Sequence, residues 1–460
     1  MEARPLPLER PKARFWLGLL AVQLLIGGIA LGTRTELLVL AGVAAVALAA
    51  AWTLLPSLWI GSLVLSTVAL NLLQSEEVTA VEIVVVAALI GTLLAWLGWH
   101  TLVQRRRLVL HWGDLLLLLF VGFALLNLPI ALLNDVPLLE WMRGWVPLLL
   151  LLAYFPVRHF IRRPEQVHLF LGLLLLCGIV IAAVALWRYR QGVSLAEYAY
   201  QLRTGIARSH GEHLLAFLIL GCIAGMLLLR RWWWRLLLAA GAVFMGAAVM
   251  VTFSRTAWLS LAIGIVVLWL ALRWKQRLQL LLAGAALSAA ATLILTIGFP
   301  QVSDILLRLV QHRFASIAQG RQDLAVGGRL HQLSIGVRKT LELPLGGHGI
   351  RKPYSYLEPA YRRHISYAYI HNAYVATAYR QGIPMLLLLV GMLGAHLFDT
   401  LRRLRRTAPD SLERMTTALG VAALCAAMLS LMMTENPLDG RTLTITLAWI
   451  LSVANLRLSA

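Results

Sequence analysis

The sequence predicts an all-α polytopic membrane protein with roughly twelve to fourteen transmembrane helices. Of its 460 residues, 60% are hydrophobic and only 13% are charged, and the mean hydropathy is +0.78, far above the range of soluble proteins. A helix needs about 20 apolar residues to cross a bilayer, and such runs follow one another along most of the chain. The sequence contains no visible internal repeat and no soluble domain, so residues 1–460 are expected to form a single integral membrane domain.

Short polar or charged segments separate the candidate spans. Their expected limits are 15–33, 37–55, 57–73, 78–99, 114–134, 144–160, 166–188, 213–229, 236–252, 256–272, 279–299, 380–400, 412–434 and 441–457. Only Pro56-Ser57 separates the second span from the third, so this pair is either two spans or a hairpin that does not fully cross. The first run lacks a clear cleavage site and is therefore expected to remain as an uncleaved span.

The charges of the connecting segments predict the orientation of the spans. Alternate short connections are basic, and all of them fall on the side of the N-terminal segment. They are Arg105-Arg106-Arg107, Arg162-Arg163, Arg230-Arg231 with Arg235, Arg273 to Arg277, and Arg402 to Arg406. Because short cytoplasmic loops are enriched in Lys and Arg, both termini are expected in the cytoplasm. The opposite face then holds residues 74–77, 135–143, 189–212, 254–255, 300–370 and 435–441.

Residues 300–370 form the large, partly helical loop of that opposite face, which is expected to cap the membrane domain. The loop carries ten Lys/Arg against four acids, in a chain whose net charge is +20. A basic segment at a membrane surface suits an anionic substrate or anionic lipids. A nucleic-acid partner is not expected, because the sequence has no basic helix with interleaved aromatic residues.

The sequence offers no pattern of metal ligands. It lacks both His-Glu-x-x-His and Cys-x-x-Cys, and Cys177, Cys222 and Cys425 all fall inside apolar runs. Cysteines in such positions are typical of small buried hydrophobic residues. We therefore expect no metal ion and no cofactor.

Two arginines of the capped face have settings that suit a phosphate or diphosphate. Arg255 lies where one span ends and the next begins, within reach of the headgroup plane, where a guanidinium could bind a phosphate in bidentate fashion. Arg329 lies near the start of an expected amphipathic helix that runs to about Leu343, on the same face as Gln332, and a helix N-terminus also favours an anion. The alternatives are a snorkelling interfacial arginine and a solvated loop arginine, respectively.

Arg208 and Arg338 are further candidates for anion binding. Arg208 precedes the cluster His210-x-Glu212-His213, which does not have the spacing of a metal site. Arg338 is one of the ten basic residues of the large loop.

His371 is the candidate general base. It opens a segment in which Gly382-Ile-Pro384 is expected to break or kink the chain before the next span. If this segment is helical from its start, His371 and Tyr374 share one face. Nearby positive charge would lower the pKa of the imidazole and keep it neutral, as a base requires. The alternative is a capping or interfacial histidine.

Two neighbours of His371 bear on the same site. Asn372 could hold the imidazole or a substrate hydroxyl. The glycine-rich stretch Pro344-Leu-Gly-Gly-His-Gly349 is either a tight turn or a phosphate cradle, and it lacks the Gly-Lys-Ser/Thr ending of a P-loop.

Together these pieces resemble the O-antigen ligase and polymerase superfamily of bacterial envelope glycosyltransferases. The matching pieces are Ser254-Arg255 at a span end, Gly-Arg329-Leu in the large loop, Pro-Leu-Gly-x-Gly before the histidine, and His371-Asn372 with nine residues before Gly382. The ligase motif continues with two residues and then Gly, Thr or Tyr, whereas this chain has Met385. The resemblance therefore leaves ligase and polymerase open. It covers residues 255–384 and the overall topology.

The resemblance implies a GT-C-like, metal-independent glycosyltransferase of the bacterial inner membrane, with its active site facing the periplasm. The implied donor is a glycan on undecaprenyl diphosphate, and the implied acceptor of a ligase is the lipid A–core of lipopolysaccharide. By the same resemblance, His371 would deprotonate the acceptor hydroxyl, and Arg255 and Arg329 would hold the diphosphate. Direct displacement would invert the anomeric carbon. The expected function is that of an O-antigen ligase, with the oligomeric state left open.

Other functions are compatible with parts of the sequence. An O-antigen polymerase or a protein O-oligosaccharyltransferase would use the same donor and similar residues. A polysaccharide transporter or flippase would show repeated halves and ionisable groups near the membrane midplane, whereas the charges here crowd the ends of the spans. A scaffolding membrane protein would leave the polar residues of the capped face without a role.

The predicted topology makes residues 300–370 periplasmic. Single cysteines placed in this loop should react with a membrane-impermeant thiol reagent in intact spheroplasts, because the reagent reaches only the outer face of the inner membrane. A cysteine placed at 105–107 is the control and should react only after lysis. The reverse labelling pattern would overturn the topology.

Overall fold

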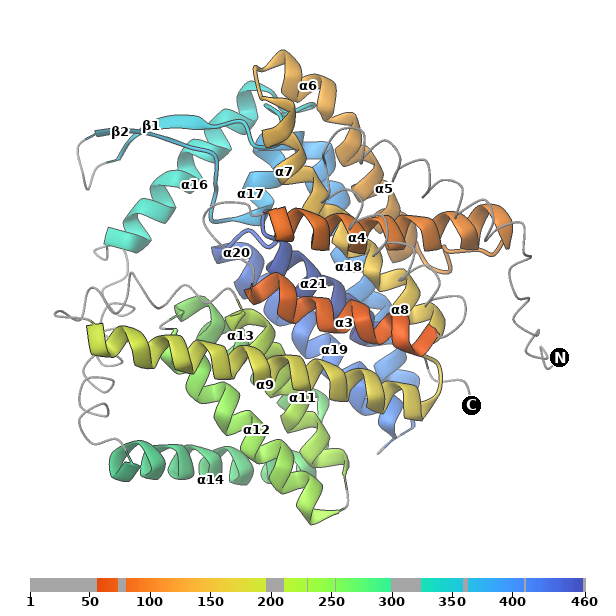
Figure 1. The fold of residues 1–460 in the computed structure, drawn as a ribbon, viewed down its shortest axis with the longest axis vertical. Helices are drawn as coiled ribbons and strands as arrows, with labels where there is room; N and C mark the ends of the chain where they lie inside the picture. Colours follow the sequence, from red (N-terminus) through yellow and green to blue (C-terminus); the bar gives the residue numbers. More distant parts are fainter. Residues whose placement is uncertain are drawn as a thin grey trace. The chain divides into compact units, whose positions relative to one another are not determined.

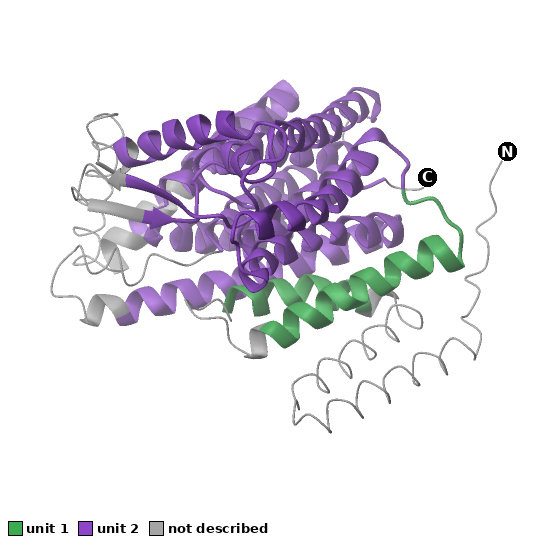
Figure 2. Ribbon diagram, turned by 90° about the horizontal axis from the view of Figure 1, so that it is seen from above, with its two compact units in different colours: residues 1–108 green, residues 109–460 purple. Residues whose placement is uncertain are grey.

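The structure, a computed structural model, describes residues 56–72, 80–195, 211–229, 231–252, 254–298, 324–358, 363–408 and 411–457. The first two expected spans, 15–33 and 37–55, lie outside these residues. The chain packs as two compact units, residues 1–108 and 109–460 (Figure 2). The first unit contributes α3 (Pro56–Leu72), α4 (Ala80–Gly98) and the π-helix Trp99–Val103.

The second unit is built almost entirely from helices (Figure 1). They are α5 (Trp112–Leu126), α6 (Leu128–Leu133), α7 (Leu138–Leu149), α8 (Tyr154–Phe160), α9 (Pro164–Leu195), α11 (Glu212–Leu228), α12 (Trp232–Val251), α13 (Arg255–Ala271), α14 (Trp274–Gly298), α16 (Leu324–Glu342), α17 (Ala373–Gln381), α18 (Ile383–Arg406), α19 (Leu412–Ala426), α20 (Met432–Thr434) and α21 (Arg441–Ala454). Within the described residues, seven helical stretches are long and apolar enough to cross a membrane, and four more apolar helices are shorter. The prediction of a polytopic helical membrane protein is confirmed.

Several of the expected spans are not one regular α-helix; residues 144–160, for example, run from α7 through the 3₁₀-helix Leu150–Ala153 into α8. Residues 114–134 are divided at Asn127 into α5 and α6, and residues 412–434 contain the π-helix Ala427–Leu431 between α19 and α20. At the break, the side chain of Asn127 makes two long-range hydrogen bonds. Its Oδ1 accepts the backbone N–H of Ile350 at 2.7 Å, and its Nδ2 donates to the carbonyl oxygen of Arg380 at 3.0 Å. The interruption therefore ties α5 to segments far along the chain.

The core of the second unit forms around α19. In the apolar stretch Leu412–Thr434, 83% of the most hydrophobic window is buried inside the protein, so this helix is surrounded by protein rather than lipid. It packs against α11, α13, α18 and α21. Small residues such as Gly420 and Ala422 let these neighbours approach closely.

A polar cluster holds one end of the bundle together. Asp114 in the first turn of α5 accepts hydrogen bonds from the backbone N–H groups of Leu110 and His111, at 2.7 and 3.0 Å. Its other oxygen accepts from the hydroxyl of Tyr154, at 2.7 Å, and from Arg158. Because the carboxylate is fully buried, these four partners offset the cost of removing it from water.

The cap lies at the opposite end of α18 and contains α16, a β-hairpin and α17 (Figure 1). The helix expected to end near Leu343 is confirmed as α16. The hairpin, β1 (Tyr354–Glu358) and β2 (Arg363–Tyr367), is antiparallel and was not expected from the sequence. Tyr354 and Tyr356 alternate with Ser355, so both rings face inward and join Ile370, Ala376 and Tyr379 in a buried cluster.

The glycine-rich stretch before the hairpin is a tight turn. Gly347 and Gly349 have φ of +69° and +104°, values that favour glycine. The amides of His348 and Gly349 donate to the carbonyl oxygens of Tyr379 and Arg380, at 2.8 and 2.9 Å. These amides therefore bind the end of α17 rather than a phosphate.

Gly382 forms the expected break between α17 and α18, and its substitution tests the turn. Its φ is +86°, and an added Cβ would lie 2.2 Å from the carbonyl oxygen of Leu345. Gly382→Ala should lower stability by about 1–3 kcal/mol, measured as a lower melting temperature in detergent. Gly394 lies inside α18 with open space around an added Cβ, so Gly394→Ala is the matched control and should not destabilise. Equal melting temperatures for the two variants would contradict this account.

Candidate active site

His371 lies just before α17, where its backbone is fixed by Asn372. Asn372 caps the helix: its Oδ1 accepts the N–H of Val375 at 2.9 Å, and its Nδ2 donates to the carbonyl oxygen of Met433 at 3.0 Å. The helix begins at Ala373, so His371 lies outside it and does not share a helix face with Tyr374. An Asn at the N-cap begins the helix after itself, which leaves His371 in a bend outside the helix. The side chain of Asn372 thus positions the histidine.

The imidazole of His371 is held by Gln332 of α16. Its Nδ1 lies 2.9 Å from Oε1 of Gln332, and Nε2 of Gln332 donates to the hydroxyl of Tyr356 at 3.0 Å. Because the amide NH₂ donates to Tyr356, the amide oxygen faces the histidine and accepts a hydrogen bond from Nδ1–H. This network assigns the Nδ1–H tautomer, with Nε2 left as a proton acceptor.

The surroundings keep this imidazole neutral. Burial, and then the positive charge of Arg329, lower the pKa of His371 from its ordinary 6.5 to about 4. The ring of Tyr369 packs edge-on against it, with centroids 4.8 Å apart. A neutral histidine with an acceptor Nε2 is the form a general base requires.

Arg329 lies one turn before Gln332 on α16 and pairs with Glu435, which follows α20. Its Nη2 is 3.2 Å from Oε1 of Glu435, and Oε2 of Glu435 accepts the hydroxyl of Tyr369 at 3.1 Å. Burial raises the pKa of the Glu435 carboxyl above its ordinary value, although Arg329 and Tyr369 oppose this. Arg329, Glu435, Tyr369 and His371 therefore form one connected polar group.

Arg255 begins α13 beside the same turn. Ser254 caps this helix by accepting the N–H of Ala257 at 3.3 Å. The next residue, Thr256, receives a hydrogen bond from Thr434 between their hydroxyl oxygens at 2.9 Å. Since Thr434 precedes Glu435, the helix start that carries Arg255 is fastened to the turn that pairs with Arg329.

A buried ion pair fastens α17 to the turn before α21, and the sequence analysis missed it. Arg380 is only 5% exposed and donates to both carboxylate oxygens of Asp439, at 3.1 and 3.0 Å. It also donates to the carbonyl oxygen of Ala368 at 2.6 Å. The available signal was the assignment of residues 435–441 and of the loop 300–370, which leads into His371, to one face. Neither Arg380 nor Asp439 stands in a pattern that distinguishes a buried pair from a surface pair.

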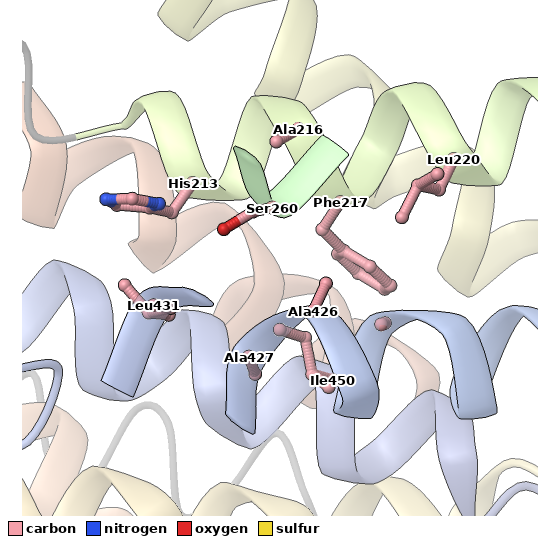
Figure 3. A pocket seen from close by; sticks show the side chains of 10 residues that line it. His213, Ala216, Phe217, Leu220, Ser260, Ala426, Ala427, Leu431 and Ile450 are labelled. Carbon is pink, nitrogen blue, oxygen red and sulfur yellow. The ribbon is translucent and has the colours of Figure 1, made fainter. Parts of the chain in front are cut away.

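A small cavity lies between the first turns of α11 and α13 and the helices α19 and α21. Its lining is mostly apolar, but His213 and Ser260 also face it (Figure 3). Nδ1 of His213 and Oγ of Ser260 are buried without a hydrogen-bond partner in the described part of the chain. The cavity is about the size of one water molecule, which could pair with both atoms.

Comparison with known families supports the sequence resemblance. Residues 240–390 match the family model described as O-antigen ligase, and this range contains Arg255, Arg329 and His371. Over residues 240–390, the match supports the O-antigen ligase superfamily. The match indicates an enzyme of the glycosyltransferase kind and does not separate ligases from polymerases. No curated protein matches the chain.

Two further residues, Arg208 and Arg338, were expected at this site. Arg208 falls outside the described residues. Arg338 is exposed on α16, and nine residues at about 100° each place it on the opposite side of that helix from Arg329. The structure therefore does not bring Arg338 into the polar group. Within the described ranges, no cluster of three or more His, Cys, Asp or Glu side chains could hold a metal ion.

The hydrogen bond to Gln332 should be needed for catalysis, because it fixes both the tautomer and the ring orientation of His371. Gln332→Leu should lower the glycan-transfer rate by about 10–100-fold, within the range that general-base catalysis supplies, at normal protein abundance. Tyr356→Phe removes only the anchor of Gln332 and should be milder. Ser334→Ala, exposed on the same helix, is the control. A fully active Gln332→Leu protein would show that the Nδ1 contact does not matter.

Proposed function

We propose that this protein is an O-antigen ligase that transfers a glycan from undecaprenyl diphosphate to the lipid A–core of lipopolysaccharide at the periplasmic face of the bacterial inner membrane. The observation that supports this proposal most directly is the neutral His371. Its Nδ1 is held by Gln332, its Nε2 can accept a proton, and it lies in one polar group with Arg329. The superfamily match supports the same chemistry. The surrounding membrane lipids and the lipid-linked substrates are the expected partners.

The reaction proceeds by direct displacement. His371 Nε2 takes the proton of the acceptor hydroxyl as the acceptor oxygen forms its bond to the anomeric carbon. The bond between that carbon and the diphosphate oxygen breaks, and the electron pair leaves with the diphosphate. A single displacement inverts the anomeric carbon.

The arginines supply the electrostatic part of the mechanism. The leaving diphosphate gains negative charge as the bond breaks, and guanidinium groups aimed at it stabilise this charge. Arg329 and Arg255 have this role in the proposal, Arg329 beside His371 and Arg255 at the start of α13. Because the leaving group is stabilised by these cations, the proposed reaction needs no metal ion, and activity should be retained in EDTA.

The acceptor separates the proposed function from its closest alternative. Met385 departs from the ligase motif and favours an O-antigen polymerase as the second candidate, and a protein O-oligosaccharyltransferase would use the same donor. Lipopolysaccharide from a deletion strain distinguishes them. A ligase defect leaves lipid A–core without polymeric glycan while the glycan accumulates on its carrier. A polymerase defect leaves single repeats attached to the core.

His371 provides the direct test of the mechanism. His371→Ala should lower the transfer rate by about 10²–10⁴-fold, with unchanged abundance and folding, because no base then accepts the hydroxyl proton. His331 precedes Gln332 on α16, and His331→Ala is the matched control. It should lower the transfer rate only slightly. Transfer by His371→Ala at a near-normal rate would exclude the histidine from the chemistry.

The pH profile adds a second readout. Only the neutral imidazole accepts a proton, and its pKa is about 4, so the rate should hold from neutral pH down to about 5 and fall below that. An ordinary histidine would already lose activity between about pH 7 and 6. Initial rates with chemistry limiting are the measurement, and a midpoint near 6.5 would contradict the buried, Arg329-adjacent setting of His371.

A further inference from the structure

Arg329 is occupied by a carboxylate of the protein itself. Oε1 of Glu435 lies 3.2 Å from its Nη2. Glu435 is held in place from its other side, because its Oε2 accepts the hydroxyl of Tyr369 at 3.1 Å. That hydroxyl is fixed in turn by the backbone N–H of Asn436 at 3.0 Å. An anion that binds Arg329 must therefore displace a well-oriented anion that is already there.

We propose that Glu435 is a specificity-determining residue that keeps the anionic single-phosphate headgroups of bulk membrane lipids, such as phosphatidylglycerol, off Arg329 and yields only to a diphosphate. The inference rests on the proposed role of Arg329 in holding the donor diphosphate. Glu435 is a positioning residue in this scheme: it does not touch the reacting atoms, and it acts through the arginine.

The exchange energies favour this discrimination. A phosphodiester headgroup carries one negative charge, as Glu435 does, so replacing the carboxylate with it gains little Coulomb energy. The displaced Glu435, with only 23% of its side chain exposed, would lose its cation while remaining largely buried, which is costly. A bulk headgroup therefore has no net advantage over the resident carboxylate.

A diphosphate differs in both charge and reach. It carries more negative charge than one carboxylate and has two phosphate groups that can engage separate cations. A second arginine, Arg255, begins α13 next to Thr256, which is bonded to Thr434 beside Glu435. A diphosphate that reaches both Arg329 on α16 and Arg255 at the start of α13 replaces the single Glu435 contact with more than one. It can therefore offset the loss of the ion pair.

The exposure of Arg329 explains why a filter is needed, that is, why Glu435 should exclude bulk lipid headgroups from the guanidinium. Its side chain is 38% exposed, and it lies at the ends of the spanning helices, where lipid headgroups are concentrated. Headgroups outnumber any lipid-linked glycan in a bilayer, so an open guanidinium would be occupied by them. Excluding the wrong ligand with a built-in repulsive group is a common route to specificity.

Glu435→Gln tests the filter because it removes the charge and keeps the shape. Purified full-length protein is placed in phosphatidylcholine nanodiscs with increasing fractions of phosphatidylglycerol, and its affinity for undecaprenyl diphosphate is measured. The wild-type affinity should change little with phosphatidylglycerol. The affinity of Glu435→Gln should be higher in pure phosphatidylcholine and fall by about tenfold as phosphatidylglycerol is added, because Arg329 is then open to headgroups.

Two further variants complete the design. Glu342→Gln is the matched control: Glu342 lies on the same helix as Arg329, pairs with Lys339 at 2.9 Å and is 47% exposed, so it should behave as wild type. Tyr369→Phe leaves the charge of Glu435 in place but removes the bond that holds it. It should give intermediate sensitivity to phosphatidylglycerol, which tests the idea even if Glu435→Gln folds poorly.

The outcomes separate this inference from the proposed function. If folded Glu435→Gln is as indifferent to phosphatidylglycerol as wild type, while Arg329→Ala weakens diphosphate binding, the filter is wrong and the donor site stands. If wild type does not bind undecaprenyl diphosphate, or Arg329→Ala binds it as tightly as wild type, the proposed donor site fails and the filter fails with it.

Discussion

The buried ion pair between Arg380 and Asp439 joins the two segments from which the candidate site is built. One segment, 368–381, carries Tyr369 and His371; the other, 435–440, carries Glu435. The bidentate geometry fixes both distance and orientation, and the carbonyl oxygen of Ala368 takes a further hydrogen bond from the same guanidinium. Removing one partner of such a pair leaves an uncompensated buried charge and typically costs about 3–5 kcal/mol. The position of the backbone that carries His371 therefore depends on this contact, as the orientation of the imidazole depends on Gln332.

The membrane imposes the second constraint, which explains why the site lies where it does. Within a bilayer core, backbone groups must be paired, so irregular chain belongs at the ends of the helices. Every irregular segment of the site, the glycine turn, the stretch before α17 and the turn after α20, lies at such an end. There the side chains of Asn127, Asn372 and Arg380 bind backbone groups that no helix satisfies. Fixed irregular backbone and charged side chains are therefore found together, as chemistry on a charged substrate requires.

The sequence predicted the helices well because each leaves a strong apolar run. Every expected span from 57–73 onward coincides with a helix or a consecutive set of helices, and Gly382 breaks the chain where the Gly-x-Pro pattern indicates. The hairpin was missed because two alternating tyrosines are a short signal, and they became buried only through contact with Ile370 and Tyr379. The break at Asn127 was missed although Pro129, in the first turn of α6, is a local signal for it. The hydrogen bond from Ile350 to Asn127 leaves no trace in the local sequence.

The residues of the candidate site also differ in whether the local sequence identifies them. His371 and Arg329 stood in motifs and were predicted as site residues. In the structure His371 is bonded to Gln332, which lies on the same face of α16 as Arg329. Glu435, Asp439 and Arg380 were not predicted as site residues. An acid in a short turn has no distinguishing neighbours in the sequence. Its role becomes visible only through the arginine with which it pairs in the folded protein. Arg338 was selected for its charge alone, and the helical period places it away from the group.

The hydrogen bonds of Asn127 have a consequence for recombination between relatives. This side chain serves backbone groups at Ile350 and Arg380, which lie 223 and 253 residues further along the chain. A hybrid protein that takes α5 from another family member and the rest from this chain would keep every motif of the candidate site intact. It would nevertheless leave an amide of the glycine turn and a carbonyl of α17 without their partner, unless the donor also has an amide side chain at that break. Crossover points for functional hybrids should therefore be chosen so that α5 and the cap are inherited together.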